Sequence, residues 1–217
     1  IPEHWEVRKI KYLGIFQNGI GISSDSFGSG YPFVSYSDVY NNLELPETVT
    51  GLVESSKEDR IKYSVKDGDV FFTRTSEAAD DIGIASTCLK TIDEATFAGF
   101  VIRFRPKANF LKNQFSKYYF RNENVKTFFT KEMNIVTRAS LSQELLKRLP
   151  AFIPSLEEQT QIVEYIETKL SKIDNVISKT EKEIELMEKY RKALISEVVT
   201  GKDRKSTRLN SSHSSPS

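Results

Sequence analysis

Two short polar segments contain side chains that can hydrogen-bond to nucleic-acid bases. The first covers 73–76 and the second covers 134–140, and both are rich in arginine, asparagine or hydroxyl groups. An arginine can bond guanine at two points, and an asparagine can bond adenine in the same way. The candidate side chains are Thr73, Arg74, Ser76, Asn134, Thr137, Arg138 and Ser140. These residue types indicate a surface that reads base edges, provided that the fold brings the two segments together.

The sequence offers little for catalysis or metal binding. The chain has one cysteine, Cys88, and two histidines, His4 and His213, so no cluster of metal ligands is expected. It contains neither a phosphate-binding Gly-rich loop ending in Gly-Lys-Ser/Thr nor an Asn-Pro-Pro-aromatic methylation motif. A nuclease-like Glu-Thr-Lys triplet at 167–169 lies in a predicted helix, where residues two apart do not face each other. We therefore predict no catalytic residues and no metal site.

Charge is distributed unevenly along a chain whose net charge is only +1. Residues 1–102 hold 9 basic and 16 acidic residues, whereas residues 103–138 hold 9 basic and 2 acidic residues. Such a split suggests one basic face that contacts phosphates, and a solvated face is an equal alternative. The single cysteine suits a reducing cytosol, and no stretch of about 18 apolar residues predicts a membrane span. We expect a cytoplasmic protein.

Turn signals and apolar patterns divide residues 1–152 into strands and helices. The expected strands are 31–39, 65–74 after a turn at Asp67-Gly68, 83–89 and 97–104, and the expected helices are 109–133 and 143–149. The aromatic residues of 109–133 recur at helical spacing, which predicts that they lie in the core; a stacking platform for unpaired bases is the alternative. The pattern predicts an α+β fold.

A much longer helix is predicted to follow. Ser155 and Glu158 form a Ser-x-x-Glu capping box, and Pro154 stands just before the cap, outside the helix. Neither proline nor glycine occurs again until Gly201, which suits a C-terminal stop. About 45 helical residues at 1.5 Å per residue would form a rod of roughly 68 Å.

Apolar residues repeat along this helix at alternating steps of three and four. They form an a/d seam over about five heptads, which is typical of a coiled coil. The seam residues are Val163, Ile166, Leu170, Ile173, Ile177, Ile184, Met187, Leu194 and Val198. Thr180 and Arg191 interrupt the seam, and polar residues there usually lower stability and fix register. The alternative is a single amphipathic helix that lies on a globular core.

The start and the end of this helix carry a resemblance to a known family. Residues 150–163, Pro-Ala-Phe-Ile-Pro-Ser-Leu-Glu-Glu-Gln-Thr-Gln-Ile-Val, and residues 194–202 closely resemble the conserved spacer region of type I restriction–modification specificity subunits (HsdS). The opening stretch 1–10, with its Pro and Trp, is similar to the start of that family's recognition domains. The resemblance implies a DNA-recognition domain with a bent mixed sheet at 1–152 and a spacer coiled-coil helix at 153–202. The serine-rich tail, 203–217, matches neither and is expected to be disordered or foreign to the fold.

The resemblance also implies a function. Subunits of this family read DNA, while partner methyltransferase (M) and restriction (R) subunits bind S-adenosylmethionine and ATP, so no cofactor is expected on this chain. Segment 31–39 resembles the family's first signature, and with the glycine-rich loop before it adds Ser23, Ser24 and Tyr36 to the DNA-binding candidates. The alternative, from another class, is a coiled-coil adaptor whose globular domain binds protein rather than DNA.

Specificity subunits usually carry two recognition units in tandem, and this chain holds one. An exposed seam is disfavoured by water, and closed twofold dimers are the commonest homo-oligomers. We therefore expect a homodimer of half-subunits with antiparallel helices, which would read a bipartite, palindromic double-stranded DNA target.

Overall fold

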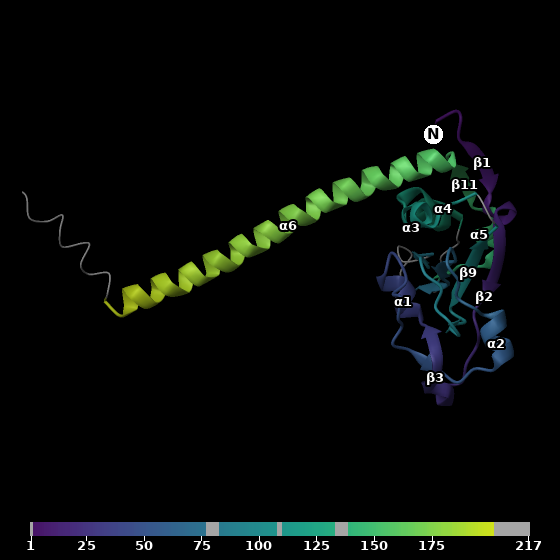
Figure 1. The fold of residues 1–217 in the computed structure, drawn as a ribbon, viewed down its shortest axis with the longest axis horizontal. Helices are drawn as coiled ribbons and strands as arrows, with labels where there is room; N and C mark the ends of the chain where they lie inside the picture. Colours follow the sequence, from purple (N-terminus) through teal and green to yellow (C-terminus); the bar gives the residue numbers. More distant parts are fainter. Residues whose placement is uncertain (1, 77–82, 108–109, 133–138, 202–217) are drawn as a thin grey trace, which may run out of the picture. The chain divides into compact units, whose positions relative to one another are not determined.

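The computed structural model describes residues 2–76, 83–107, 110–132 and 139–201. The chain divides into two compact units, Ile1–Glu164 and Tyr165–Ser217. The first unit mixes strands and helices, and the second contains most of one long helix (Figure 1). The expected α+β class is therefore confirmed.

A four-stranded antiparallel sheet runs through the first unit. Its strands, in order across the sheet, are β2 (Gly14–Asn18), β9 (Val101–Pro106), β5 (Val70–Thr73) and β7 (Ala85–Thr87). Side chains from the two faces of β5 enter different apolar clusters: Phe72 lies with Phe104 in one, and Phe71 lies with Phe97 in the other. Burial on both faces explains why β5 is a continuous apolar run. The predicted turn before it is present, with Gly68 at φ +84°.

A second, three-stranded sheet has the order β4 (Leu52–Val53), β3 (Phe27–Val34) and β8 (Thr96–Phe97), with β3 and β8 parallel. The strand predicted over 31–39 was too long. It ends at Val34, and helix α1 (Tyr36–Asn41) begins after a capping box in which Ser35 and Asp38 satisfy each other's backbone N–H groups. A Ser-x-x-Asp sequence favours a helix start over a continued strand. Tyr36 is therefore a helical residue.

The strand predicted over 97–104 is interrupted. β8 ends at Phe97, the chain turns at Ala98, and β9 begins at Val101, whose N–H bonds the Ala98 carbonyl at 3.0 Å. Two glycines permit this turn to lie against the loop after β2. A Cβ on Gly19 would lie 2.1 Å from the Ala98 carbonyl oxygen, and a Cβ on Gly99 would lie 3.1 Å from that of Ile20.

Region 109–133 forms two helices rather than one, α3 (Asn113–Tyr119) and α4 (Glu123–Glu132). Both contribute aromatic side chains to the first apolar cluster, where Phe115 and Phe129 are buried. The prediction that these aromatics form core is confirmed. Helix α2 (Lys57–Lys62) and helix α5 (Gln143–Arg148) complete the short helices.

The basic stretch 103–138 is not simply one basic face. Arg105 forms a two-point ion pair with buried Asp69, at 2.6 and 2.7 Å. Arg103 is buried and bonds the Ser64 carbonyl, and burial lowers the pKa of its guanidinium to about 10. Arg121 donates to the carbonyls of Ala85 and of residues at the end of α1. These three arginines stabilise the fold instead of offering charge to a phosphate backbone.

Two short antiparallel ribbons tie distant segments together. The first pairs β1 (Glu6–Lys9) with β11 (Pro150–Ile153), and the second pairs β6 (Thr75–Ser76) with β10 (Ala139–Ser140). The first ribbon fixes the start of the chain to the residues that lead into the long helix.

Helix α6 (Leu156–Val199) is continuous and 44 residues long (Figure 1). The predicted capping box is present: Ser155 N–H donates to Glu158 at 3.1 Å, and Glu158 N–H donates to Ser155 Oγ at 3.2 Å. The helix ends before Gly201, which has φ +74°. Both predicted ends are confirmed.

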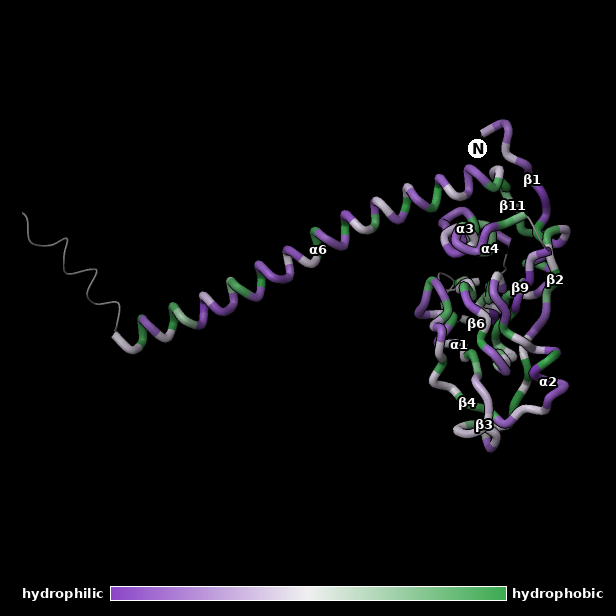
Figure 2. The backbone as a smooth tube through the Cα atoms, viewed as in Figure 1, coloured by the Kyte–Doolittle hydropathy of each residue, from purple (hydrophilic) through white to green (hydrophobic). Residues whose placement is uncertain are grey.

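The seam divides into two parts. Val163 is buried in the first apolar cluster of its own unit, so it is part of the core and not of a helix pairing surface. Figure 2 shows apolar residues recurring between polar ones along the rest of α6. Exposure of at least 40% is found at Leu170, Ile173, Ile177, Ile184, Met187, Leu194 and Val198. None of the helices in the described part of the chain carries an apolar stretch long enough to cross a membrane.

Candidate nucleic-acid interface

The β6–β10 ribbon joins the polar segment 73–76 to the end of the polar segment 134–140. Ser140 pairs with Thr75, and Ala139 pairs with Ser76. The Leu141 N–H extends the contact by donating to the Arg74 carbonyl at 2.6 Å. Segments more than 60 residues apart thus form one surface, which the sequence could suggest only through shared residue types.

Tyr36 reaches the same ribbon from helix α1. Its hydroxyl donates a hydrogen bond to the Thr75 carbonyl at 2.9 Å, and its ring stacks on Tyr40 with centroids 5.9 Å apart. The hydroxyl is thereby used to position β6. Tyr36 therefore supports the backbone of β6, and its direct contact with DNA stays a prediction.

The remaining candidates are distributed over several environments. Thr73 is buried and its Oγ1 accepts a 3.0 Å hydrogen bond from the Ile84 N–H, so its hydroxyl holds the loop and is not presented for base reading. Arg74 is partly exposed and Ser140 is exposed. Ser23 is exposed and lies 3.2 Å, Oγ to Oγ, from Ser26. The candidates Asn134, Thr137 and Arg138 lie outside the described residues.

Ser24 begins the short 3-10 helix η2 (Ser24–Ser26), which leads into β3 of the three-stranded sheet. Ser23 and Ser24 therefore lead into the three-stranded sheet, whereas Arg74 follows β5 of the four-stranded sheet. Contacts to the ribbon backbone join Tyr36, Arg74 and Ser140, and within the described residues no such contact joins the two serines to the ribbon.

The last residue of β2 contacts helix α5, which follows the ribbon strand β10. Gln143 Nε2 donates to Asn18 Oδ1 at 2.8 Å, and the Leu145 N–H donates to Ser142 Oγ at 3.1 Å as the cap of α5. Sequence reasoning missed Asn18 and Gln143 because their contact joins residues 125 positions apart. The only local sign of this contact in the sequence was the amide side chain of Gln143, directly after the cap residue Ser142.

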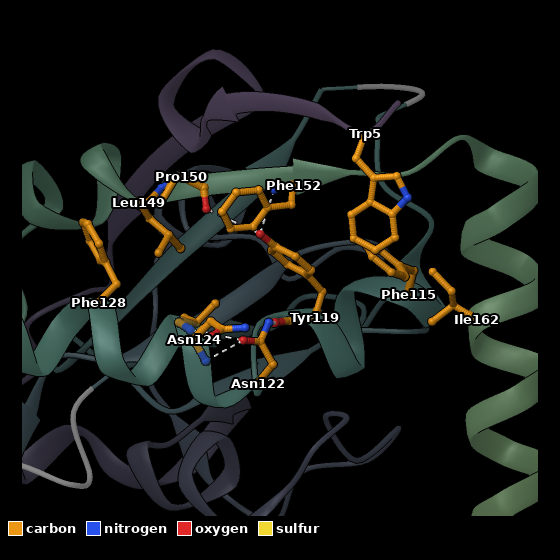
Figure 3. A pocket seen from close by; sticks show the side chains of 11 residues that line it. Trp5, Phe115, Tyr119, Asn122, Asn124, Phe128, Leu149, Pro150, Phe152 and Ile162 are labelled. Carbon is orange, nitrogen blue, oxygen red and sulfur yellow. Dashed lines mark hydrogen bonds between the residues drawn. The ribbon is translucent and has the colours of Figure 1, made fainter. Parts of the chain in front are cut away.

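An apolar hollow of about 460 Å³ lies elsewhere in the first unit, beside the start of α6 (Figure 3). Trp5, Tyr119 and Phe152 line it, and its two polar residues are Asn122 and Asn124. Asn122 is occupied as a cap, since its Oδ1 accepts from the Asn124 N–H at 2.8 Å. The lining thus combines aromatic and aliphatic groups with no acid–base pair.

The thiol of Cys88 is buried, and burial raises its pKa to about 12. A thiol with that pKa stays protonated and unreactive at neutral pH. Among the described residues, no three His, Cys, Asp or Glu side chains lie together as metal ligands would.

Glu158 and Gln159, at the start of α6, each have a structural role. Gln159 is fully buried: its Oε1 accepts from the Lys112 N–H at 2.8 Å, and its Nε2 donates to the carbonyls of Phe110 and Pro154. Glu158 caps the helix and lies 2.7 Å from His4 Nε2. The pair therefore locks the helix start to the β9–α3 loop and to the start of the chain.

Residues 2–186 match the family model of the type I restriction modification DNA specificity domain. The chain belongs to this family. It is 30% identical over 209 residues to the type I restriction enzyme MjaVIII specificity subunit of Methanocaldococcus jannaschii, and 29% identical over 205 residues to the MjaX specificity subunit of the same organism. These matches cover 94% and 92% of this chain but 47% and 46% of the relatives. The chain thus spans about half the length of the curated relatives it matches.

Solved structures show the same fold at low sequence identity. The HsdS subunit of Thermoanaerobacter tengcongensis has a TM-score of 0.57 at 16% identity, covering 80% of this chain and 39% of that one. A chain from a study of complex assembly and conformational transition in the type I R-M system has a TM-score of 0.61 at 17% identity, covering 86% and 44%. The family resemblance noted in the sequence is confirmed.

Proposed function

We propose that this chain is the sequence-specific DNA-binding half of a type I restriction–modification specificity subunit. The observation that carries the proposal is the β6–β10 ribbon, which places Arg74 beside Ser140 on one surface of a specificity-family domain. Arginine is the side chain best suited to two-point reading of guanine. The chain itself carries out no chemistry in this proposal.

The partners follow from the same proposal. The chain would bind double-stranded DNA and direct M and R subunits, which would carry S-adenosylmethionine and ATP, to the target. Its place of action would be the cytoplasm. The match to the DNA specificity domain fits this function and not the coiled-coil adaptor, whose globular unit would bind protein.

Selection from random duplexes, with a methyltransferase partner present, tests this function. We expect enrichment of a short base pattern that survives competitor DNA. Binding that falls with salt but shows no base preference would contradict the proposal, because phosphate contacts alone give that result.

We further propose that the chain forms a homodimer through α6. The apolar seam from Leu170 to Val198 is exposed in the isolated chain. A second copy would bury this seam, and an antiparallel arrangement would place one recognition domain at each end. The target would then be palindromic, with two half-sites separated by a spacer that the helices set.

Because Val163 lies in the core of its own unit, we propose that the pairing begins C-terminal to it. If pairing begins at the next seam residue, an antiparallel a-to-d arrangement aligns Ile166 with the second copy's Val198 and Leu170 with its Leu194. Thr180 then meets Ile184, and Ile173 meets Arg191. Every seam position from 166 to 198 has an opposite partner in this register.

Light scattering at micromolar concentration tests the dimer. We expect about twice the chain mass of 24.8 kDa, and a return to monomer when Ile177→Lys and Ile184→Lys are combined. A monomeric unmutated protein would remove the twofold proposal without affecting base reading by one domain.

A further inference from the structure

Phe100 is a large apolar residue on the surface beside the candidate interface. Its side chain is 63% exposed, whereas Phe97 and Phe104 on either side of the turn are fully buried. A phenyl ring left in water forgoes the favourable burial that the other two rings gain. Single exposed apolar residues are common, and Ile61 is equally exposed, so what distinguishes Phe100 is its place beside Arg74.

The backbone that carries this ring is fixed from several directions. The Ile20 N–H donates to the Phe97 carbonyl at 2.9 Å, and the Gly19 N–H donates to the Val101 carbonyl at 3.1 Å. The Ala98 N–H donates to the Val34 carbonyl at 3.0 Å. Gly99 packs so closely on Ile20 that a Cβ would be crowded. The ring is thus presented on a preorganised turn rather than on a loose loop.

Phe100 lies next to Arg74 at the end of the central sheet. Thr73 and Val101 form the last pair of the β5–β9 ladder, and Arg74 and Phe100 are the residues directly beyond it. The Arg74 N–H donates to the Phe100 carbonyl at 2.9 Å, so the backbones of the two residues are in contact where the two strands end. Phe100 belongs to the turn that Ala98 and Val101 close, and Arg74 follows β5. The arginine and the phenylalanine are therefore neighbours through their backbones at one edge of the sheet.

An arginine beside an apolar ring is a combination that matches the major groove. The arginine reads guanine, and the apolar group contacts the C5-methyl of thymine, which is the one apolar feature that distinguishes bases there. We propose that Phe100 is a specificity-determining residue that packs on the methyl group of one thymine in the target. The proposal rests on the DNA-reading function proposed above.

The test is a scan in which each thymine of the selected duplex is replaced in turn by deoxyuridine, which lacks only the methyl group. Affinity is measured for the full chain with its methyltransferase partner. We expect one position at which the replacement weakens binding by about three- to fivefold, the factor for one additional buried methyl group. Phe100→Ala should weaken binding to the thymine duplex by at least that factor and abolish the difference between thymine and deoxyuridine at that position.

Two variants serve as controls. Ile61→Ala removes an equally exposed apolar side chain, 69% exposed on α2, and should leave the deoxyuridine response unchanged. Phe100→Leu keeps an apolar contact and should retain part of the response. Thermal melts of all three variants should match the unmutated chain, because the altered side chains are exposed.

The possible results distinguish a failure of the Phe100 proposal from a failure of the proposed DNA-reading function. If the chain selects a base pattern but no thymine methyl matters, or if Phe100→Ala keeps the sensitive position, the inference is wrong and the DNA-reading function stands. If Phe100→Ala weakens only the association with the methyltransferase subunit, the ring is a protein contact and the inference is again wrong. If no base pattern is selected at all, the proposed function fails and the inference falls with it.

Discussion

The hydroxyl of Tyr36 donates a 2.9 Å hydrogen bond to the backbone carbonyl of Thr75. This bond joins helix α1 to the ribbon strand that follows Arg74. A two-residue ribbon has few ladder bonds of its own, so an anchoring side chain has a large share in holding it. The position of Arg74 therefore depends on a residue that the sequence suggested as a direct DNA contact.

Tyr36→Phe tests that dependence. The change removes the hydroxyl and keeps the ring that stacks on Tyr40. We expect a loss of about 0.5–1.5 kcal/mol in the free energy of unfolding, the usual net value of one hydrogen bond, and weaker binding to the selected duplex without a change in its base pattern. Urea unfolding and a binding titration measure the two effects. A changed base pattern would instead indicate that Tyr36 itself touches a base.

Arg74→Ala is expected to relax the preference at one base pair and to cost about 1–3 kcal/mol of binding free energy, because a two-point contact to guanine is lost. Compared with Arg74→Ala, Arg74→Lys should restore the positive charge but little of the base preference, since an ammonium lacks the planar two-point geometry. Lys90→Ala is the matched control: Lys90 is exposed and pairs with Glu47 away from the ribbon. An unchanged pattern with Arg74→Ala would remove Arg74 from the readers.

Several features could be predicted because their causes are local. The capping box at Ser155, the turn at Gly68 and the core aromatics of α3 and α4 all follow from neighbours within a few residues. Local sequence also contained the start of α1 at Ser35, but the apolar run before it was extended too far. Element boundaries of this kind depend on a competition between two local signals.

Other features could not be predicted because they join distant residues. The basic stretch was expected to supply a basic face, yet Arg105 is paired with Asp69 and Arg121 with carbonyls of α1 and β7. Nothing in the spacing of Val163 distinguished it from the other seam residues, and only tertiary packing places it in the core. Phe100 was not singled out because the predicted strand over 97–104 did not include the turn that exposes its ring.

Gln159→Leu is expected to be strongly destabilising. It leaves the Lys112 N–H and the carbonyls of Phe110 and Pro154 without the partners that the buried amide supplies. A buried polar group left unsatisfied costs about 1–3 kcal/mol, so the total should exceed about 2 kcal/mol. Chemical denaturation measures it, and Gln161→Leu, at an exposed position two residues on, should change stability much less.

Glu158 makes part of the stability depend on pH. The hydrogen bond to His4 and then that from the Ser155 N–H lower the pKa of this carboxyl from 4.5 to about 2. A carboxyl whose pKa is lowered on folding stabilises the protein above its unfolded pKa, and the contribution disappears as pH falls through the folded pKa. Between pH 5 and pH 2, the unmutated chain should therefore lose stability more steeply than Glu158→Gln, as measured by urea midpoints. Parallel curves for the two proteins would contradict this role.

The antiparallel register makes a prediction that a parallel pair cannot meet. It places Thr180 opposite the second copy's Ile184, so a mixture of Thr180→Cys chains and Ile184→Cys chains should form a disulfide between unlike chains on mild oxidation. Each variant alone should stay uncrosslinked, because two copies of residue 180 are then in different layers. A parallel pair reverses both results, since it places each position opposite itself. The buried Cys88 does not interfere.

The charges beside the seam predict how the yield of this disulfide depends on salt. The e positions of the heptads hold four acids, Glu167, Asp174, Glu181 and Glu188. An antiparallel pair brings e positions of the two helices together, so raised salt should screen the repulsion and increase the yield of the mixed disulfide. Non-reducing gels and mass measurement of the mixed product provide the readout, and crosslinking of either variant alone would rule out the antiparallel arrangement.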